Sequence, residues 1–221
     1  MTLHDTARFI PLVPLLVIVM SLADRILIQE VRTLSDDWYV LKKTTFNYRR
    51  RDGVWQTLSR ETYDRGHGAT ILLYDPDRRT VILTRQFRFP AYVSGWPDLL
   101  IEAPAGLLDN ASPEERIRAE PEEETGYRVR DVRKVFEAFM SPGSVTEILH
   151  FFVGRYSPSD RITAGGGNES EGEDIEVFEL TIDDALEMIR NGTIRDGKTI
   201  MLLQHAALSL FTPSAKPLVQ T

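Results

Sequence analysis

Short runs of strand-forming residues, separated by turn signals, occupy most of the chain between residues 38 and 180. These runs are rich in Val, Ile, Thr, Tyr and Phe, the residues that favour β-strands. Asp52-Gly53 separates two of the runs, which is a strong hairpin signal. The predicted strands are 38–41, 44–48, 54–63, 69–74, 80–87, 99–101, 132–139, 148–156 and 175–180.

Helical signals are confined to three segments, of which the first is the best defined. Ser112 stands where an N-cap is expected, and Glu115 completes a capping box. Gly126 supplies a C-terminal stop. Many strands with few helices predict an α+β domain, with helices packed on a mixed sheet. The predicted helices are 113–125, 182–191 and 198–211.

The segment from Phe9 to Ala23 differs from the rest because it is apolar and carries no charge. It is shorter than the roughly 20 residues that a membrane-spanning helix needs. Three interpretations stay open. In the first, residues 1–19 are not native and Met20 is the true start. In the second, the segment is a signal sequence or membrane anchor, and in the third it is a structured part of the fold.

The charge balance and the lack of cysteine narrow the function classes. The chain has 33 acidic against 26 basic residues, a net charge of −7, which disfavours binding to the phosphates of nucleic acid. Without cysteine there are neither disulfides nor thiolate metal sites, so a bound metal would be a hard cation held by oxygen ligands. An acidic protein that handles phosphates needs such an ion or a few placed arginines.

Three glutamates lie on one face of the first predicted helix. Glu123 and Glu124 follow Glu120 by three and four residues, the spacing at which helical side chains are neighbours. Such a cluster is unfavourable by itself and becomes favourable when a divalent cation sits among the oxygens. A solvated acidic face is the alternative, and Arg116 alone does not neutralise three carboxylates.

The stretch from Gly106 to Gly126, GLLDNASPEERIRAEPEEETG, resembles the signature of the Nudix hydrolase family, in which a glycine and a loop precede a glutamate-rich helix. Three further segments resemble the nucleotide-sugar branch of the family: EAPAG at 102–106, MSPG at 140–143 and DGKT at 196–199. The resemblance covers roughly residues 25–211. It implies a Nudix-type α/β/α sandwich with a mixed sheet, preceded by a small antiparallel β subdomain.

The resemblance also implies a domain organisation and a reaction. The expected segments are an apolar extension 1–24, a β subdomain 25–66, a Nudix hydrolase domain 67–211 and a tail 212–221. The expected reaction is hydrolysis of GDP-mannose to GMP and mannose 1-phosphate with Mg²⁺, or with Mn²⁺ as a substitute. ADP-ribose or another ADP-sugar is the alternative substrate. The enzyme is expected to be a cytoplasmic homodimer without nucleic-acid partners, and to reach a membrane only through residues 9–23.

The implied metal and catalytic residues are mostly acidic. Glu123 is expected to bind or orient the metal, and Glu147 to orient the attacking water or bind substrate. Glu173 follows a glycine-rich segment, 164–172, which we expect to be a mobile loop that closes over the metal. A solvated acidic loop is the alternative there. The implied metal ligands are the carbonyl of Ala105 and the carboxylates of Glu120, Glu124 and Glu173.

The implied substrate contacts lie on the N-terminal hairpin, in the signature and near the last helix. Trp38 is expected to stack on the base from the partner subunit, although a core role is the alternative. Arg88 is expected to bind the diphosphate through its planar guanidinium, with Arg85 as the rival. The implied set is Trp38, Arg60, Glu61, Arg88, Ala105, Gly106, Leu107, Glu124, Glu147, Glu173 and Lys198.

Several positions depart from the family signature. Ala119 replaces its arginine, and Ala111 or Ser112 stands at its earlier glutamate. Pro121 lies inside the predicted helix, where proline removes a hydrogen bond and costs about 3 kcal/mol. We expect a kink that moves Glu120 relative to Glu124. A catalytically weakened nucleotide-sugar binding protein therefore stays open as an alternative.

Overall fold

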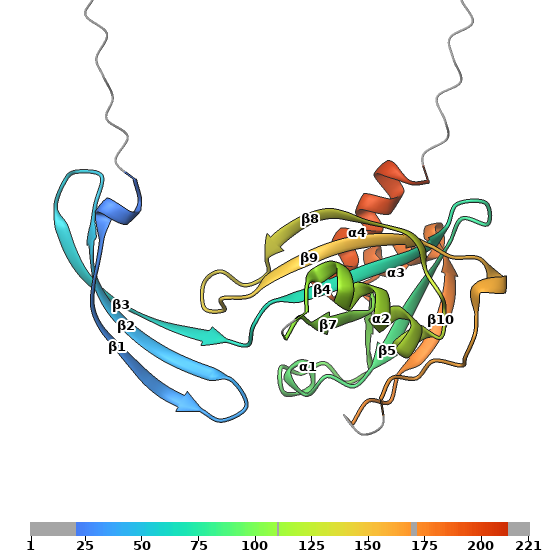
Figure 1. Cartoon of the computed structure of the whole chain (residues 1–221), viewed down its shortest axis with the longest axis horizontal. Helices are drawn as coiled ribbons and strands as arrows, with labels where there is room; N and C mark the ends of the chain where they lie inside the picture. Colours follow the sequence, from blue (N-terminus) through green and yellow to red (C-terminus); the bar gives the residue numbers. More distant parts are fainter. Residues whose placement is uncertain (1–20, 110, 169–171, 212–221) are drawn as a thin grey trace, which may run out of the picture.

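The structure is a computed structural model that describes residues 21–109, 111–168 and 172–211. It contains two separate sheets, a three-stranded antiparallel sheet at the N-terminal end and a seven-stranded mixed sheet (Figure 1). Most of the apolar stretch 9–23 lies outside the described residues, so the three interpretations of it stay predictions. No helix in the described ranges is long and apolar enough to span a bilayer.

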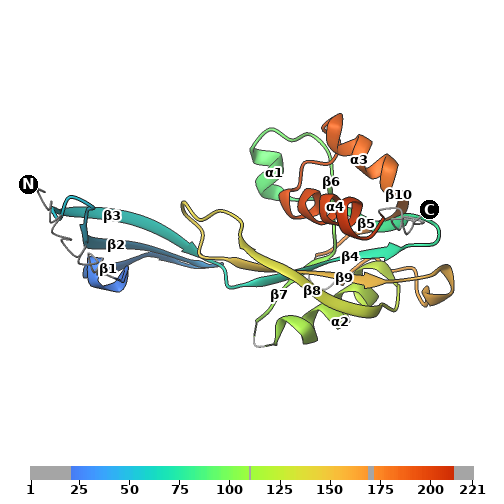
Figure 2. The ribbon, with the colours of Figure 1, turned by 90° about the horizontal axis from the view of Figure 1, so that it is seen from above.

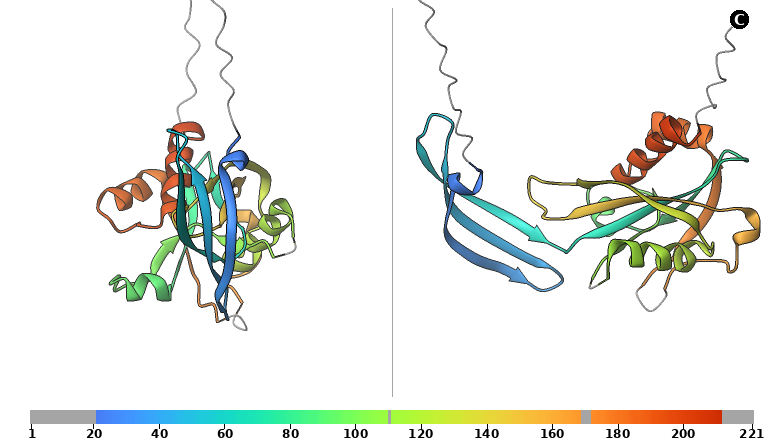
Figure 3. Two further views of the ribbon diagram at one scale, coloured as in Figure 1. Left: turned by 90° about the vertical axis from the view of Figure 1, so that its left-hand side faces the viewer. Right: turned by 45° about the horizontal axis from the view of Figure 1, so that its top comes forward.

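The three-stranded sheet projects from the remainder of the protein as an arm, which Figure 3 shows from two further sides. Its first strand was not predicted from the sequence. Two register shifts, at Ile28/Glu30 and Thr33/Ser35, interrupt the alternation of that strand and hide its period of two. Trp38, which we expected in a strand, lies instead in the turn after it. The arm strands are β1 (Ile26–Asp36), β2 (Val40–Arg49) and β3 (Trp55–Asp64).

The larger sheet has the strand order β10-β5-β4-β9-β8, with β6 added to β5 and β7 added to β4. Its β4–β9 pair is parallel and its other pairs are antiparallel, so the sheet is mixed as predicted. The short strand β7 was not predicted. The strands are β4 (Gly68–Asp75), β5 (Thr80–Gln86), β6 (Leu100–Glu102), β7 (Ala105–Leu107), β8 (Arg130–Phe139), β9 (Ile148–Arg155) and β10 (Glu176–Thr181).

Helices cover both faces of this sheet (Figure 2). Ile71 and Ile117 belong to the core under α2, whereas Leu72 and Leu202 belong to the core under α3 and α4. Neighbouring residues of β4 thus point into opposite cores, as the period of a strand requires. The α+β, α/β/α fold prediction is confirmed. The helices are α1 (Phe89–Val93), α2 (Pro113–Thr125), α3 (Ile182–Arg190) and α4 (Gly197–Ser209).

Helix α2 has the predicted ends. Ser112 and Glu115 form the capping box, and Gly126 ends the helix with a left-handed φ of 75°. The helix runs without interruption through Pro121, which is buried. The hydroxyl of Thr125 donates to the carbonyl of Pro121, which adds a side-chain hydrogen bond to the turn that follows the proline. Pro121 therefore does not break the acidic helix.

The described part of the glycine-rich segment is fixed to α2. The amide of Gly166 donates to the Glu124 carbonyl at 2.9 Å, and the amide of Gly167 donates to the Glu123 carbonyl at 3.4 Å. These bonds use carbonyls that the end of a helix leaves without partners. In the structure residues 164–168 lie against the C-terminal end of α2, and the mobility expected of the loop stays a prediction.

Candidate active site

Helix α2 turns two of its glutamates toward the sheet. Glu120 is 6% exposed and Glu124 is 2% exposed. The two lie one turn apart on the helix face that also contains the buried Ile117. Glu123 lies on the exposed side of the helix. The structure therefore brings Glu120 and Glu124 together and separates them from Glu123.

The backbone of β7 leaves room for Glu120 only because residue 106 is a glycine. A Cβ on Gly106 would lie 1.9 Å from Glu120 Oε1, far inside van der Waals contact. Strand β7 pairs with β4 through Ala105↔Thr70 and Leu107↔Gly68, which fixes its position beside the helix. Ala105 and Gly106, on β7 where the signature begins, therefore lie beside Glu120 on α2.

Glu124 is a buried carboxylate whose pKa is shifted by its surroundings. Burial raises its pKa well above the usual value, and the negative charges of Glu120 and Glu173 raise it further, while Arg88 opposes them. Its Oε2 is buried and has no hydrogen-bond partner among the described residues. A buried carboxylate oxygen of this kind suits an incoming cation.

Glu173 is held in a different way. Its Oε2 accepts a hydrogen bond of 2.9 Å from the amide of Asn168, in the segment that closes α2. In the part of the chain that the structure describes, no three His, Cys, Asp or Glu side chains form a ready metal-ligand set. Glu173 is close enough to influence Glu124 electrostatically, while its Oε2 is held by the Asn168 amide.

Two cations face a buried carboxylate beside α2. Glu102 is 3% exposed, and it accepts hydrogen bonds from Arg88 Nε at 2.7 Å and Lys198 Nζ at 2.5 Å. Lys198 Nζ also lies 3.0 Å from Asp196 Oδ2. Burial acts to lower the pKa of Arg88, but the Glu102 carboxylate more than offsets it and the pKa is raised. Arg88 is thereby held as a cation whose charge reaches Glu124, and Lys198 is paired with the same Glu102 carboxylate.

Arg85, the rival of Arg88, points elsewhere. It forms a half-exposed ion pair with Glu176 across the β5–β10 pair, with Nη2 2.5 Å from Oε2. Glu102 was missed in the sequence reasoning. Its signals were its position at the charged end of a short apolar run and its place in the EAPAG segment, and neither revealed its partners.

Glu147 lies at the start of β9, beside the strands that carry the signature glycine. A Cβ on Gly68 would be 3.3 Å from Glu147 Oε1, and Gly68 pairs with Leu107 of β7. Arg65 Nε lies 3.7 Å from the same Glu147 oxygen. The structure therefore places Glu147 at the edge of the sheet where β4 and β7 begin their pairing.

The predicted contacts on the arm are not joined to these carboxylates within one chain. Trp38 is 83% exposed in the β1–β2 turn, and Arg60 and Glu61 lie exposed on β3. The link between arm and site is indirect. Tyr39, next to Trp38, lies under the guanidinium of Arg65, whose other neighbour is Glu147.

Two family models match the chain. The model of the GDP-mannose pyrophosphatase NudK N-terminal domain matches residues 25–63, which include most of the arm. The model of the NUDIX domain matches residues 64–203, which include the mixed sheet and α2. The chain belongs to the Nudix family. In this Nudix protein the arm and the α/β/α sandwich correspond to separate family models.

Curated relatives share more than half of the aligned residues. A GDP-mannose pyrophosphatase of Pectobacterium atrosepticum is 56% identical over 82% of this chain and 93% of its own length. A GDP-mannose pyrophosphatase of Escherichia coli O1:K1 is 54% identical over 80% and 93%. A crystal structure of an ADP compounds hydrolase superposes with a TM-score of 0.65 and 15% identity, over 83% of this chain and 93% of the other. At that identity it supports the Nudix fold alone.

Proposed function

We propose that this Nudix protein hydrolyses the diphosphate bond of GDP-mannose, adding water and releasing GMP and mannose 1-phosphate. The names and identities of the relatives support this substrate. The observation that carries the chemistry is the buried Glu124, whose Oε2 has no hydrogen-bond partner in the described residues and whose pKa is raised by acidic neighbours and lowered by Arg88. Such an arrangement suits a cation and a diphosphate bound side by side.

The residues present fit a hard divalent cation. Glu120 and Glu124 would hold it, with the Ala105 carbonyl and Glu173 completing the set and Glu123 orienting it from the exposed side. Their oxygen ligands favour Mg²⁺, with Mn²⁺ as a substitute. When bound, the metal would neutralise phosphate charge and lower the pKa of a bound water.

The positive side of the site would bind the diphosphate. Arg88 presents a planar fork to phosphate oxygens, and Lys198 presents a point charge. Both are held by Glu102, so their positions are set before substrate arrives. Gly106 and Leu107 would approach the substrate with their backbone. Glu147, which Arg65 restrains, would orient the attacking water or bind substrate.

The arm supports a homodimer. Its first strand exposes apolar side chains, with Leu27, Ile28 and Val31 all at least 50% exposed. Trp38 lies exposed in the turn between β1 and β2, and Arg60 and Glu61 lie exposed on β3 (Figure 1 shows the arm). They would serve the substrate of the partner subunit, where Trp38 would stack on the base.

The direct test is hydrolysis of GDP-mannose and ADP-ribose in parallel, with Mg²⁺ and with chelator. We expect metal-dependent release of GMP and mannose 1-phosphate, with ADP-ribose turned over more slowly. Glu124→Gln should abolish hydrolysis, while Glu122→Gln, at an exposed position two residues earlier in the same helix, should not. Faster turnover of ADP-ribose would mean that ADP-ribose, and not GDP-mannose, is the substrate. Binding of GDP-mannose without turnover would support the alternative of a catalytically weakened nucleotide-sugar binding protein.

The dimer has its own test. Light scattering should give twice the mass of the chain, and mixing two defective proteins, Trp38→Ala and Glu124→Gln, should recover activity that neither has alone. Recovery requires that an intact arm completes an intact carboxylate site on another chain. A monomer by light scattering would contradict the shared site. A dimer whose mixed variants recover no activity would contradict it as well.

A further inference from the structure

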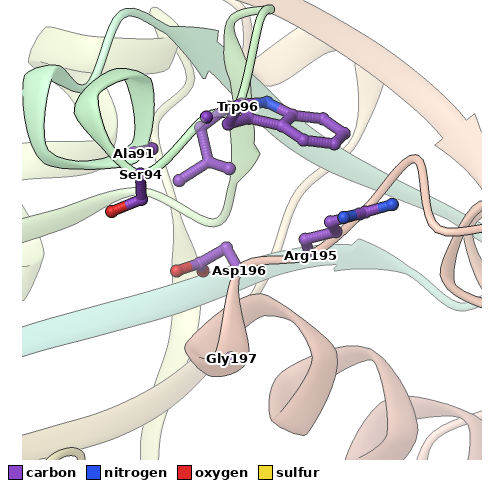
Figure 4. A pocket seen from close by; sticks show the side chains of 8 residues that line it. Ala91, Ser94, Trp96, Arg195, Asp196 and Gly197 are labelled. Carbon is purple, nitrogen blue, oxygen red and sulfur yellow. The ribbon is translucent and has the colours of Figure 1, made fainter.

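A cavity of about 370 Å³ lies beside the cationic part of the site (Figure 4). It is formed by α1, the segment that follows it, and the start of α4. Its volume is within the range of small-molecule pockets. The sequence reasoning assigned none of its lining residues. Those that the argument uses are Ser94, Trp96, Leu100, Arg195 and Asp196.

The outer wall of the cavity is an aromatic ring held by an arginine. The guanidinium carbon of Arg195 lies 4.6 Å from the ring centroid of Trp96. Arg195 Nε also donates to the Gly192 carbonyl at 2.9 Å, and Trp96 Nε1 donates to the Leu99 carbonyl at 3.4 Å. Trp96 is therefore half-buried and restrained from two sides, so the wall is largely formed before a ligand binds.

The inner wall is shared with the diphosphate-binding cations. Asp196 lines the cavity, and its Oδ2 lies 3.0 Å from Lys198 Nζ. Lys198 in turn shares Glu102 with Arg88. A diphosphate bound between Arg88 and Lys198 would thus have one of its two substituents next to Asp196.

The charges of the lining favour a neutral, hydroxyl-rich group. Asp196 disfavours a further phosphate, and Arg195 disfavours a cation. A pyranose ring presents hydroxyls that can donate to a carboxylate and exchange hydrogen bonds with Ser94, and an apolar face that can pack on Trp96 and Leu100. Because both charged groups line one small cavity, a hexose matches it better than a charged ligand.

We infer that this cavity receives the hexosyl group of the substrate, with Trp96 as the residue that determines affinity for the sugar. The inference rests on the proposed function, since it takes the diphosphate to lie between Arg88 and Lys198. It assigns the opposite end of the substrate, the nucleoside, to the rest of the site and to the arm.

The test separates the sugar from the nucleotide. Trp96→Ala should raise the KM for GDP-mannose by about tenfold, the effect of one lost aromatic contact. The inhibition constant of GDP, which has no sugar, should stay within about twofold of wild type. Trp96→Phe should restore most of the affinity because it keeps an aromatic face. Binding of mannose 1-phosphate, measured by calorimetry, should weaken in Trp96→Ala and recover in Trp96→Phe.

Each other outcome overturns the inference. Equal weakening of GDP and GDP-mannose would assign the cavity to the nucleoside or mean that Trp96 only supports the fold. An unchanged KM in Trp96→Ala would leave the cavity without a ligand. Either result leaves the proposed function intact as long as the wild-type enzyme turns over GDP-mannose in the same assays. The sugar site and the proposed function can therefore fail separately.

Discussion

Arg116 Nε lies 2.5 Å from Glu120 Oε1, one turn away on helix α2. The family signature has its arginine next to Glu120, at the position where this chain has Ala119. Arg116 instead supplies a positive charge at the carboxylate from the preceding turn, and its Nε would lie 2.9 Å from a Cβ on Gly106. It thus fills the space between the helix and β7 in which Glu120 lies.

We expect Arg116→Leu to lower the free energy of unfolding of the metal-free protein by about 1–2 kcal/mol, because it leaves Glu120 buried next to Glu124 without its counter-charge. Mg²⁺ should remove most of the deficit, since the cation replaces the lost charge. Urea unfolding with and without Mg²⁺ measures both effects. Arg118→Leu, an exposed arginine on the same helix, is the control, and an equal loss there would contradict the role of Arg116.

Gly106→Ala should separate β7 from α2. The new Cβ would overlap Glu120 Oε1, so the carboxylate must move and stability should fall by about 1–3 kcal/mol. Binding of Mn²⁺, followed by electron paramagnetic resonance, should weaken together with hydrolysis. Gly143→Ala is the matched control because a Cβ there meets nothing within 4 Å. Unchanged Mn²⁺ affinity in Gly106→Ala would show that Glu120 does not need its present position.

Pro121→Ala tests whether the proline costs stability. It restores an amide that can donate to the carbonyl of Ile117, and proline is about 3 kcal/mol worse than alanine in a helix interior. Loss of buried ring contacts offsets part of this, so we expect a gain of about 1–2 kcal/mol, or a rise in Tm of a few degrees. Differential scanning calorimetry measures it. A lower Tm would mean that the packing of the ring outweighs the missing hydrogen bond.

The acid stability of the protein should depend on Glu179 of strand β10. Hydrogen bonds from Arg78, at 2.6 Å to each oxygen, and from Tyr156 hold the pKa of Glu179 below its usual value, although burial opposes them. The ionised group therefore stabilises the fold above the unfolded-state pKa of about 4.3. This stabilisation should be lost as the pH falls from there through the lower folded-state pKa.

Glu179→Gln should flatten that part of the pH profile. Urea unfolding at a series of acidic pH values would show it, and Arg78→Leu should flatten the profile as well because it removes the main cause of the lowered pKa. A wild-type slope in both variants would mean that other carboxylates control the acid transition.

Local signals in the sequence were sufficient for the helix that carries the site. Ser112 and Glu115 cap its start and Gly126 ends it, because capping depends on residues three or four apart. Strand β1 escaped prediction since its register shifts break the alternation on which a strand prediction depends. The short helix α1 escaped because five residues give too little periodicity to detect.

Contacts between distant segments were beyond the reach of such signals. Glu102 and Lys198 are 96 residues apart in sequence, and only the packing of α4 against β6 brings them together. The separate orientation of Glu123 and Glu124 was also not predicted, because both lie within one turn of Glu120 and the sequence does not say where the buried face ends. The cavity beside Trp96 depends on three elements at once, and the DGKT segment at 196–199, which supplies part of its lining, did not reveal it.

The hydrogen bonds from Gly166 and Gly167 tie the segment 164–168 to the last turn of α2. Glu173 lies on the loop that these amides begin, and Glu124 lies on the helical turn whose carbonyls they close. A local unfolding event that frees the loop must also expose the last turn of the helix. The two carboxylates therefore belong to one cooperative unit, so the loop and the helix gain or lose their order together.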